Sequence, residues 1–225
     1  MDCRRSDGES RHGHFKAVIV SSKIHPTAVV EHDVLIGANT SVWDHAHIRH
    51  GTRLGEDCIV GGKSYIAYDV QIGNRVKINS FVYICYGVTI EDGVMISAGT
   101  IFTNDQYPRA TSPDLLTLNS SDPDDHTRPT LVCAGATIGA RCIIGSDLEI
   151  GRFSMVGMGA VVTRSVPAFH LVVGHPARSI GTVCRCGQRT SRITEQPSDE
   201  VTEVTCASCE RRYSIRGMLV TELSE

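Results

Sequence analysis

The 225-residue sequence predicts an all-β protein: a parallel β-helix of hexapeptide repeats with an extruded loop and a small C-terminal module. Three observations carry this prediction. Every sixth residue between 24 and 162 is apolar, apart from one polar interruption at 103–131, after which the period returns in the same phase. Beyond the repeats, four cysteines occur as two close pairs between residues 184 and 209.

The repeat is the strongest of these signals. Its 20 apolar positions are Ile24, Val30, Ile36, Val42, Ile48, Leu54, Val60, Ile66, Ile72, Ile78, Ile84, Ile90, Ile96, Phe102, Val132, Ile138, Ile144, Ile150, Val156 and Val162. With only 41% of the chain hydrophobic, this agreement is not a chance pattern. A six-residue period indicates a parallel β-helix in which each coil buries its inward face against the next.

Small residues mark a second inward position in each repeat. Four residues after an apolar position come Ala28, Thr40, Ala46, Thr52, Cys58, Ser64, Ala136, Cys142, Ser154 and Ala160. Side chains two residues apart on a strand face the same way, so this position and the next apolar one both point inward. The residue between them must point outward, and it is polar at His47, Arg53, Gln71, Lys77 and Thr89. Glycine often follows the apolar residue, where a tight corner tolerates no bulk.

Composition narrows the class of protein. A net charge of −3 and a pI near 6.4 argue against nucleic-acid binding or a membrane surface. No apolar run approaches the roughly 20 residues of a membrane span. Residues 1–22 are charged and lack the apolar core of a signal peptide, so we expect a disordered leader. A cytoplasmic protein with reduced thiols is therefore expected.

The interruption at 103–131 divides the β-helix domain, for which we expect residues 23–181. It contains four of the eight prolines and is rich in Ser, Thr and Asp. An irregular stretch this long within a compact repeat is usually a lid or binding loop, the alternative being a disordered surface excursion. After the last repeat, Pro167 and Pro176 are expected to discourage further regular strand pairing at 166–181.

Residues 182–225 form the predicted C-terminal module. Cys184 and Cys186 make one close pair, and Cys206 and Cys209 make a second pair further along the chain. Two cysteine pairs with such a separation are typical of a zinc ribbon, with Zn²⁺ held by four thiolates, although the first pair is one residue closer than CxxC. The segments SRIT, EVTC and RRYSI should supply short strands. The module is too small for a core of its own, so the metal would supply its folding energy; reactive or merely buried thiols are the alternative.

Several stretches carry a resemblance to a known family. They are IHPTAVV at 24–30, SVWDHAHI at 41–48, IGNRVKI at 72–78, VTIEDGV at 88–94, IFTNDQYPRA at 101–110, RPTLVCAGATIGARCIIG at 128–145 and VPAFHLVVGHPARSIG at 166–181. The chain resembles the left-handed parallel β-helix acyltransferases of the hexapeptide-repeat family. Within it, the chain looks most like enzymes that N-acetylate UDP-linked 3-amino sugars of the 2-acetamido-3-amino-2,3-dideoxy-glucuronate type. The cysteine-rich module is a departure from that pattern.

This resemblance implies a homotrimer with active sites between subunits, and acetyl-CoA or another acyl-CoA as donor in a groove of the later coils. Asn104 of the FTN motif would contact the reacting amine, and His47 matches an outward histidine whose role is less defined. The remaining expected positions are Asp105, Tyr107, Arg109 and Asn79 for the substrate and Gly139, Gly157 and Arg164 for the cofactor.

The chemistry leaves N- and O-acylation open. A sugar amine is partly neutral near pH 7 and needs no strong base, whereas a hydroxyl nucleophile usually needs a histidine. His126 is the residue that discriminates: O-acylation is plausible if it folds back onto the site, and N-acylation is preferred if it faces water. A metal site at His45, His47 and His50 is disfavoured, because these side chains need not converge. Acylation of another small molecule and a non-catalytic assembly module remain as alternatives.

Overall fold

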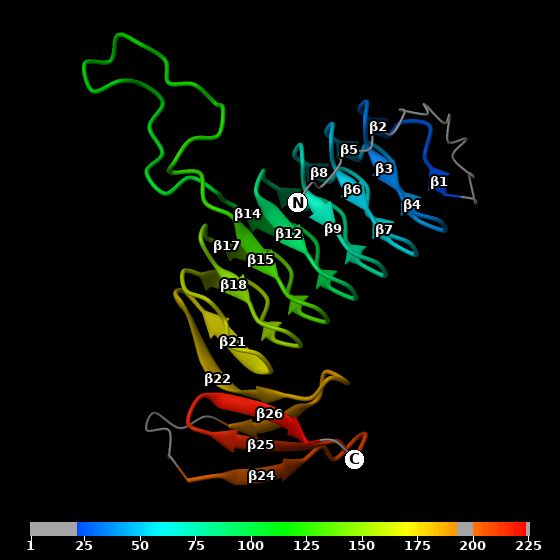
Figure 1. Ribbon diagram of the computed structural model, residues 1–225, viewed down its shortest axis with the longest axis vertical. Helices are drawn as coiled ribbons and strands as arrows, with labels where there is room; N and C mark the ends of the chain where they lie inside the picture. Colours follow the sequence, from blue (N-terminus) through cyan, green and yellow to red (C-terminus); the bar gives the residue numbers. More distant parts are fainter. Residues whose placement is uncertain (1–21, 193–199, 224–225) are drawn as a thin grey trace, which may run out of the picture.

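The computed structural model describes residues 22–192 and 200–223, and within these ranges every regular element is a β-strand (Figure 1). The leader expected at 1–22 lies outside the described residues, except for Ser22. No helix in the described ranges is long and apolar enough to cross a bilayer.

Twenty short strands form the β-helix. They belong to three sheets, and each sheet extends along the coil axis from one coil to the next. The first sheet contains β1 (Lys23–Ile24), β4 (Ser41–Val42), β7 (Ile59–Val60), β10 (Lys77–Ile78), β13 (Met95–Ile96), β16 (Thr137–Ile138) and β19 (Met155–Val156). The second contains β2 (Val29–Val30), β5 (His47–Ile48), β8 (Tyr65–Ile66), β11 (Tyr83–Ile84), β14 (Ile101–Phe102), β17 (Ile143–Ile144) and β20 (Val161–Val162). The third contains β3 (Leu35–Ile36), β6 (Arg53–Leu54), β9 (Gln71–Ile72), β12 (Val88–Ile90), β15 (Thr130–Val132) and β18 (Glu149–Ile150).

All neighbours within these three sets pair in parallel. In the first sheet, Lys23 pairs with Ser41, and Ser41 pairs in turn with Ile59. Outside the polar interruption, each step across a sheet advances the chain by three hexapeptides, one from each sheet. One coil is therefore three hexapeptides.

The core is the one that the repeat predicts. From Val42 to Val162 the apolar positions of the period are buried, and so are the small positions Thr40, Ala46 and Cys58. The buried Thr40 hydroxyl is satisfied within the stack, because its Oγ1 donates to the Gly55 carbonyl at 2.8 Å. Ile24 is 47% exposed, and within the described part of the chain no earlier coil covers it.

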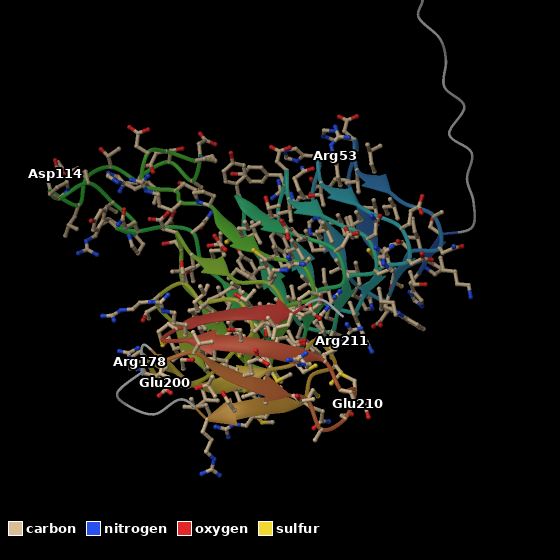
Figure 2. The ribbon with its side chains drawn as sticks, turned by 60° about the horizontal axis from the view of Figure 1, so that its bottom comes forward. Arg53, Asp114, Arg178, Glu200, Glu210 and Arg211 are labelled. Atoms are coloured by element: carbon tan, nitrogen blue, oxygen red, sulfur yellow. The ribbon has the colours of Figure 1, made fainter. Side chains whose placement is uncertain are left out.

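The polar interruption leaves the β-helix between β14 and β15 and projects away from the coils, with Asp114 at its outer part (Figures 1 and 2). Met95 pairs with Thr137, although one ordinary coil after Met95 would reach only Pro113. The extra chain is a whole number of hexapeptides in length, so the repeat returns in phase. Within the projection, Asp105 bridges to Thr127 and Thr111 to Leu118, which makes it a folded excursion.

The expectation that Pro167 and Pro176 discourage further pairing is wrong. β21 (His170–Gly174) pairs in parallel with β19, and β22 (Ala177–Val183) and β23 (Arg189–Arg192) extend the first sheet in antiparallel. Pro167 precedes β21 and Pro176 lies in the turn between β21 and β22, so neither removes a ladder donor.

The C-terminal module covers the end of the coil stack (Figure 1). Strands β24 (Thr202–Thr205), β25 (Arg212–Arg216) and β26 (Leu219–Leu223) form an antiparallel sheet. Its buried cluster consists of Phe169, Cys184, Cys206, Tyr213 and Val220, with Phe153 of the β-helix packed against it. The module therefore shares its core with the last coils.

Candidate functional site

A pocket of about 650 Å³ lies between the second sheet and the projecting loop. Its floor is made of four tyrosines from adjacent coils: Tyr65, Tyr68, Tyr83 and Tyr86. Its other wall comes from the loop, including Asn104, Tyr107, Arg109, Asp122 and His126. The loop thus supplies most of the residues that line the pocket.

Two rows of aromatic rings in contact with one another run along the coils to this pocket. The corner ladder consists of His32, His50, Tyr68 and Tyr86, with successive ring centroids 5.3, 5.4 and 5.0 Å apart. The face ladder consists of His47, Tyr65 and Tyr83, with centroids 5.3 and 5.2 Å apart. These rings recur at the same place in successive coils, a spacing visible in the sequence that could have identified both ladders, which sequence reasoning missed.

Asn104 occupies the next position of the corner ladder, one coil beyond Tyr86. Its Nδ2 donates to the Tyr86 carbonyl at 3.2 Å, and its own backbone carbonyl accepts from the Arg128 N–H at 2.8 Å. The second bond ties the beginning of the loop to its end. Only the amide NH₂ can donate to a carbonyl, so the Tyr86 contact fixes the amide orientation and turns Oδ1 the other way.

Four other predicted site residues line the same pocket: Asp105, Tyr107, Arg109 and His126. The rings of Tyr107 and His126 meet edge to face at 5.3 Å. His126 is exposed to solvent and also forms part of the pocket wall. The sequence left open whether His126 faces the site or the solvent, and in the structure it does both.

His47 lies just outside the pocket, held by a carboxylate. Glu31 contacts His47 Nε2 at 2.8 Å, Arg49 Nε at 2.6 Å and His50 Nδ1 at 3.0 Å. The His50 contact is the largest cause that holds the pKa of Glu31 well below its ordinary value. Because a carboxylate only accepts, His47 donates through Nε2, and its ring edge meets Tyr65 in the pocket floor.

Arg49 links this charged group to the pocket. Its Nη1 donates to the Tyr65 hydroxyl at 2.9 Å, and its guanidinium lies 5.7 Å from the Tyr68 ring centre. Glu31 and Arg49 together therefore position two of the four floor tyrosines.

The remaining predicted residues of the β-helix do not line the pocket. Asn79 directly follows β10, and Arg164 is exposed after β20. Gly139 and Gly157 lie at one corner, where a Cβ on Gly139 would come 2.5 Å from the Met158 nitrogen. Close packing of successive coils explains these glycines without a ligand.

The four cysteines of the module converge. The sulfur atoms of Cys184, Cys186, Cys206 and Cys209 all lie within 4.8 Å of one another, the one such metal-ligating group found among the described residues. Cys184 and Cys209 are 3.3 Å apart and Cys186 and Cys206 are 3.6 Å apart. The Tyr213 hydroxyl donates to Cys184 Sγ at 3.1 Å. Backbone N–H groups of Ser208 and Cys209 lower the pKa of the Cys206 thiol.

This set of four thiolates fits a tetrahedral Zn²⁺ ion.

The histidines at positions 45, 47 and 50 do not form a comparable metal site. His45 does not contact Glu31, whereas His47 and His50 are both paired with that carboxylate. The histidine-rich stretch is therefore an ion-pair network.

Comparisons with known proteins agree with the repeat. The family model described as bacterial transferase hexapeptide (six repeats) matches residues 33–68 and 69–104, and the hexapeptide repeat of succinyl-transferase matches 134–164. The fold and these matches define a hexapeptide-repeat β-helix protein with a cysteine-rich cap.

Within that class, the chain is similar to a particular curated relative. It is 37% identical over 94 residues to the dTDP-3-amino-3,6-dideoxy-alpha-D-galactopyranose 3-N-acetyltransferase of Aneurinibacillus thermoaerophilus. The match covers 42% of the chain and 45% of the relative, so the chain spans about half of that protein's length.

Two solved structures are among those similar to the chain. WeeI from Acinetobacter baumannii AYE is 25% identical, with a TM-score of 0.42 over 70% of this chain and 54% of that one. The hexapeptide-repeat acetyltransferase VCA0836 of Vibrio cholerae O1 biovar eltor, complexed with acetyl coenzyme A, is 26% identical, with a TM-score of 0.46 over 59% and 70%.

Proposed function

We propose that the protein is an acyl-CoA-dependent N-acetyltransferase that acylates the amine of a nucleotide-linked amino sugar. The observation that carries this proposal is the pocket in which Asn104 lies between a tyrosine floor and the inserted loop. The curated relative acts, by its name, on a dTDP-linked 3-amino sugar, which supports the same substrate class here.

In this reaction the neutral amine attacks the thioester carbonyl, the C–N bond forms, the C–S bond breaks, and the CoA sulfur leaves as thiol after taking a proton. Asn104 Oδ1 accepts a hydrogen bond from the amine and directs its lone pair at the carbonyl. Acyl transfer also needs donors for the developing oxyanion, and backbone N–H groups at the coil corners can provide them.

The histidines take different roles in this scheme. His126, in the wall of the pocket, receives the proton that the amine loses. His47 already donates to Glu31, so it positions Tyr65 and does not act as a base.

Charges in the pocket favour a neutral sugar. The wall contains Asp105, Asp122 and Asp124 against Arg109, and the Arg109 Nη1 is bonded to the Pro108 carbonyl. A carboxylate on the acceptor would meet net negative charge, so a deoxy amino sugar fits this pocket better than the uronic acid that the sequence resemblance suggests.

We extend the proposal to the assembly and the donor. The outer row of the second sheet is largely apolar apart from His47, with Val29, Tyr83, Ile101 and Ile143 each more than 40% exposed. Such a row supports a homotrimer in which a neighbouring subunit closes the site. The donor is then acyl-CoA, bound along the outer groove of the later coils with Gly139, Gly157 and Arg164 as its expected contacts, and the protein works in the cytoplasm.

The cysteine cluster would hold a structural Zn²⁺ that stabilises the cap through four thiolates. Residues 182–225 would then act as a cap on the β-helix of residues 23–181, because the cap shares its core with Phe153 and Phe169.

Purified protein incubated with acetyl-CoA and a panel of amino sugar nucleotides tests the proposal by release of the CoA thiol. Release with a dTDP-linked 3-amino-3,6-dideoxyhexose is expected. Release only with hydroxyl acceptors would favour O-acylation, for which His126 in the pocket wall is the supporting observation. No release with any acceptor would favour the non-catalytic assembly module.

A further inference from the structure

The corner ladder ends abruptly at the pocket. The rings of His32, His50, Tyr68 and Tyr86 contact one another at intervals of one coil, and the position one coil further is Asn104. Each ring before Tyr86 has a further ring over it on the side of the later coils. Tyr86 has instead the shorter side chain of Asn104, which cannot cover the outer part of a tyrosine ring.

The neighbouring face ladder ends at the same coil, but differently. One coil beyond Tyr83 lies Ile101, its partner in the parallel pair of β11 and β14. A branched aliphatic side chain therefore follows Tyr83. The place where a ring is followed by a shorter polar side chain in the pocket wall is at Tyr86, and we call it the Tyr86 step. Both tyrosines and Asn104 line the pocket, whereas Ile101 does not.

The distance between successive coils at the Tyr86 step is enough for one six-membered ring. Successive rings of the corner ladder are 5.0 to 5.4 Å apart, close to the spacing of neighbouring strands. A ring stacked on Tyr86 would consequently lie level with the Asn104 coil. An amine substituent in the plane of that ring would then be beside Asn104 Oδ1, which points away from the Tyr86 carbonyl.

A sugar has the electrostatic character that this step requires. Ring C–H groups next to oxygen carry partial positive charge, and the face of an aromatic ring is negative. The Tyr86 ring is supported from the side of the earlier coils, because the Tyr68 ring packs against it with centroids 5.0 Å apart and a tilt of 31°, and Arg49 lies over Tyr68. A supported platform lowers the ordering cost of binding.

We propose that the pyranose ring of the acceptor stacks on Tyr86 as the next member of the corner ladder, with its amine directed at Asn104. This inference rests on the proposed function and adds a positioning residue to it. Tyr86 fixes the height and tilt of the sugar, and it takes no part in proton transfer.

Kinetics of two Tyr86 variants test the inference. Tyr86→Leu removes the aromatic face and should raise the KM for the acceptor about tenfold, while the KM for acetyl-CoA changes less than about twofold. Tyr86→Phe keeps the face and should stay within about twofold of the wild type in both constants. His32→Leu removes the ring at the far end of the same ladder, outside the pocket, and should alter neither KM.

Equal acceptor KM values for Tyr86→Leu and the wild type would overturn the stacking and leave the proposed function standing. An increase in both KM values together would also overturn it, because that pattern indicates general damage.

Saturation-transfer NMR on the wild-type protein tests the contact without a variant. Irradiation of aromatic resonances should saturate the C–H protons of one sugar face most strongly. Saturation of the nucleobase protons alone would overturn the inference, even if the enzyme turns the acceptor over. Thiol release absent with every acceptor would overturn the proposed function, whereas a saturated sugar face would still support the stacking.

Discussion

Replacing Asn104 by alanine is the perturbation that bears most directly on the site. The proposed hydrogen bond from Oδ1 reaches an amine that gains positive charge as it attacks. A hydrogen bond to a charged group contributes about 1.5–3 kcal/mol, which corresponds to a loss of about 10- to 150-fold in rate. We therefore expect Asn104→Ala to lower kcat by at least about tenfold.

The same variant also loses the bond from Nδ2 to the Tyr86 carbonyl. That bond is partly buried, and its loss should cost about 1 kcal/mol of the free energy of unfolding. For a chain of this size the midpoint of thermal unfolding should fall by about 2–4 °C. The protein therefore remains folded at assay temperature, and the activity loss is not a folding effect.

Asn74→Ala is the matched control. Asn74 also lies at a coil corner, where its Oδ1 accepts from the Glu56 N–H at 2.9 Å and its Nδ2 contacts Asp92 at 3.3 Å. It is outside the pocket, so this variant should lose similar stability and keep its kcat. Steady-state thiol release and thermal unfolding measure both quantities. If Asn104→Ala kept wild-type turnover, or if Asn74→Ala lost as much, the reasoning about Asn104 would be refuted.

Three further predictions concern the cap and the coil corners. Cys206→Ser should abolish bound Zn²⁺ in metal analysis and destabilise the cap, whereas Cys133→Ser, outside the cluster, should retain the metal; equal zinc in both would contradict the site. His170 is fully buried, which lowers its pKa, so the unfolded chain binds its proton more tightly and stability should fall as pH drops below about 6.5. In His170→Gln that part of the pH dependence, followed by chemical denaturation, should disappear; an unchanged profile would mean that another group is responsible. Gly139→Ala places a Cβ 2.5 Å from the Met158 nitrogen and should cost about 1–3 kcal/mol of stability. A loss of CoA affinity with unchanged thermal stability would instead assign Gly139 to the cofactor.

The sequence alone predicts most of the coil stack, because the apolar and small positions of each hexapeptide indicate which side chains point inward. Ile96 and Ala136 are fully buried, as their places in the period require. The local pattern is sufficient here because each coil contacts only its neighbours.

The end of the stack could not be predicted in the same way. Whether Pro176 ends pairing depends on its position in a turn between two strands, and no periodicity applies there. β26 was also missed, since it forms by pairing with β25 in a module that has no repeat.

The pocket was predictable in part. The break in the period located Asn104 and the loop, and the structure brings five of the expected residues together there. The tyrosine floor was missed because a six-residue period draws attention to inward positions, whereas Tyr68 and Tyr86 recur only once per coil, at a corner. Which way the loop folds over them is a tertiary property that the loop sequence does not state.

Chemical identification of the product is the measurement that tests the central claim most directly. The purified protein would be incubated with acetyl-CoA and a dTDP-linked 3-amino-3,6-dideoxyhexose, and the sugar nucleotide analysed by mass spectrometry and by proton–nitrogen NMR correlation. An acetyl group on the sugar nitrogen, as an amide resistant to hydroxylamine, is the predicted result. A hydroxylamine-sensitive ester, or unmodified sugar nucleotide, would contradict N-acetylation in this pocket.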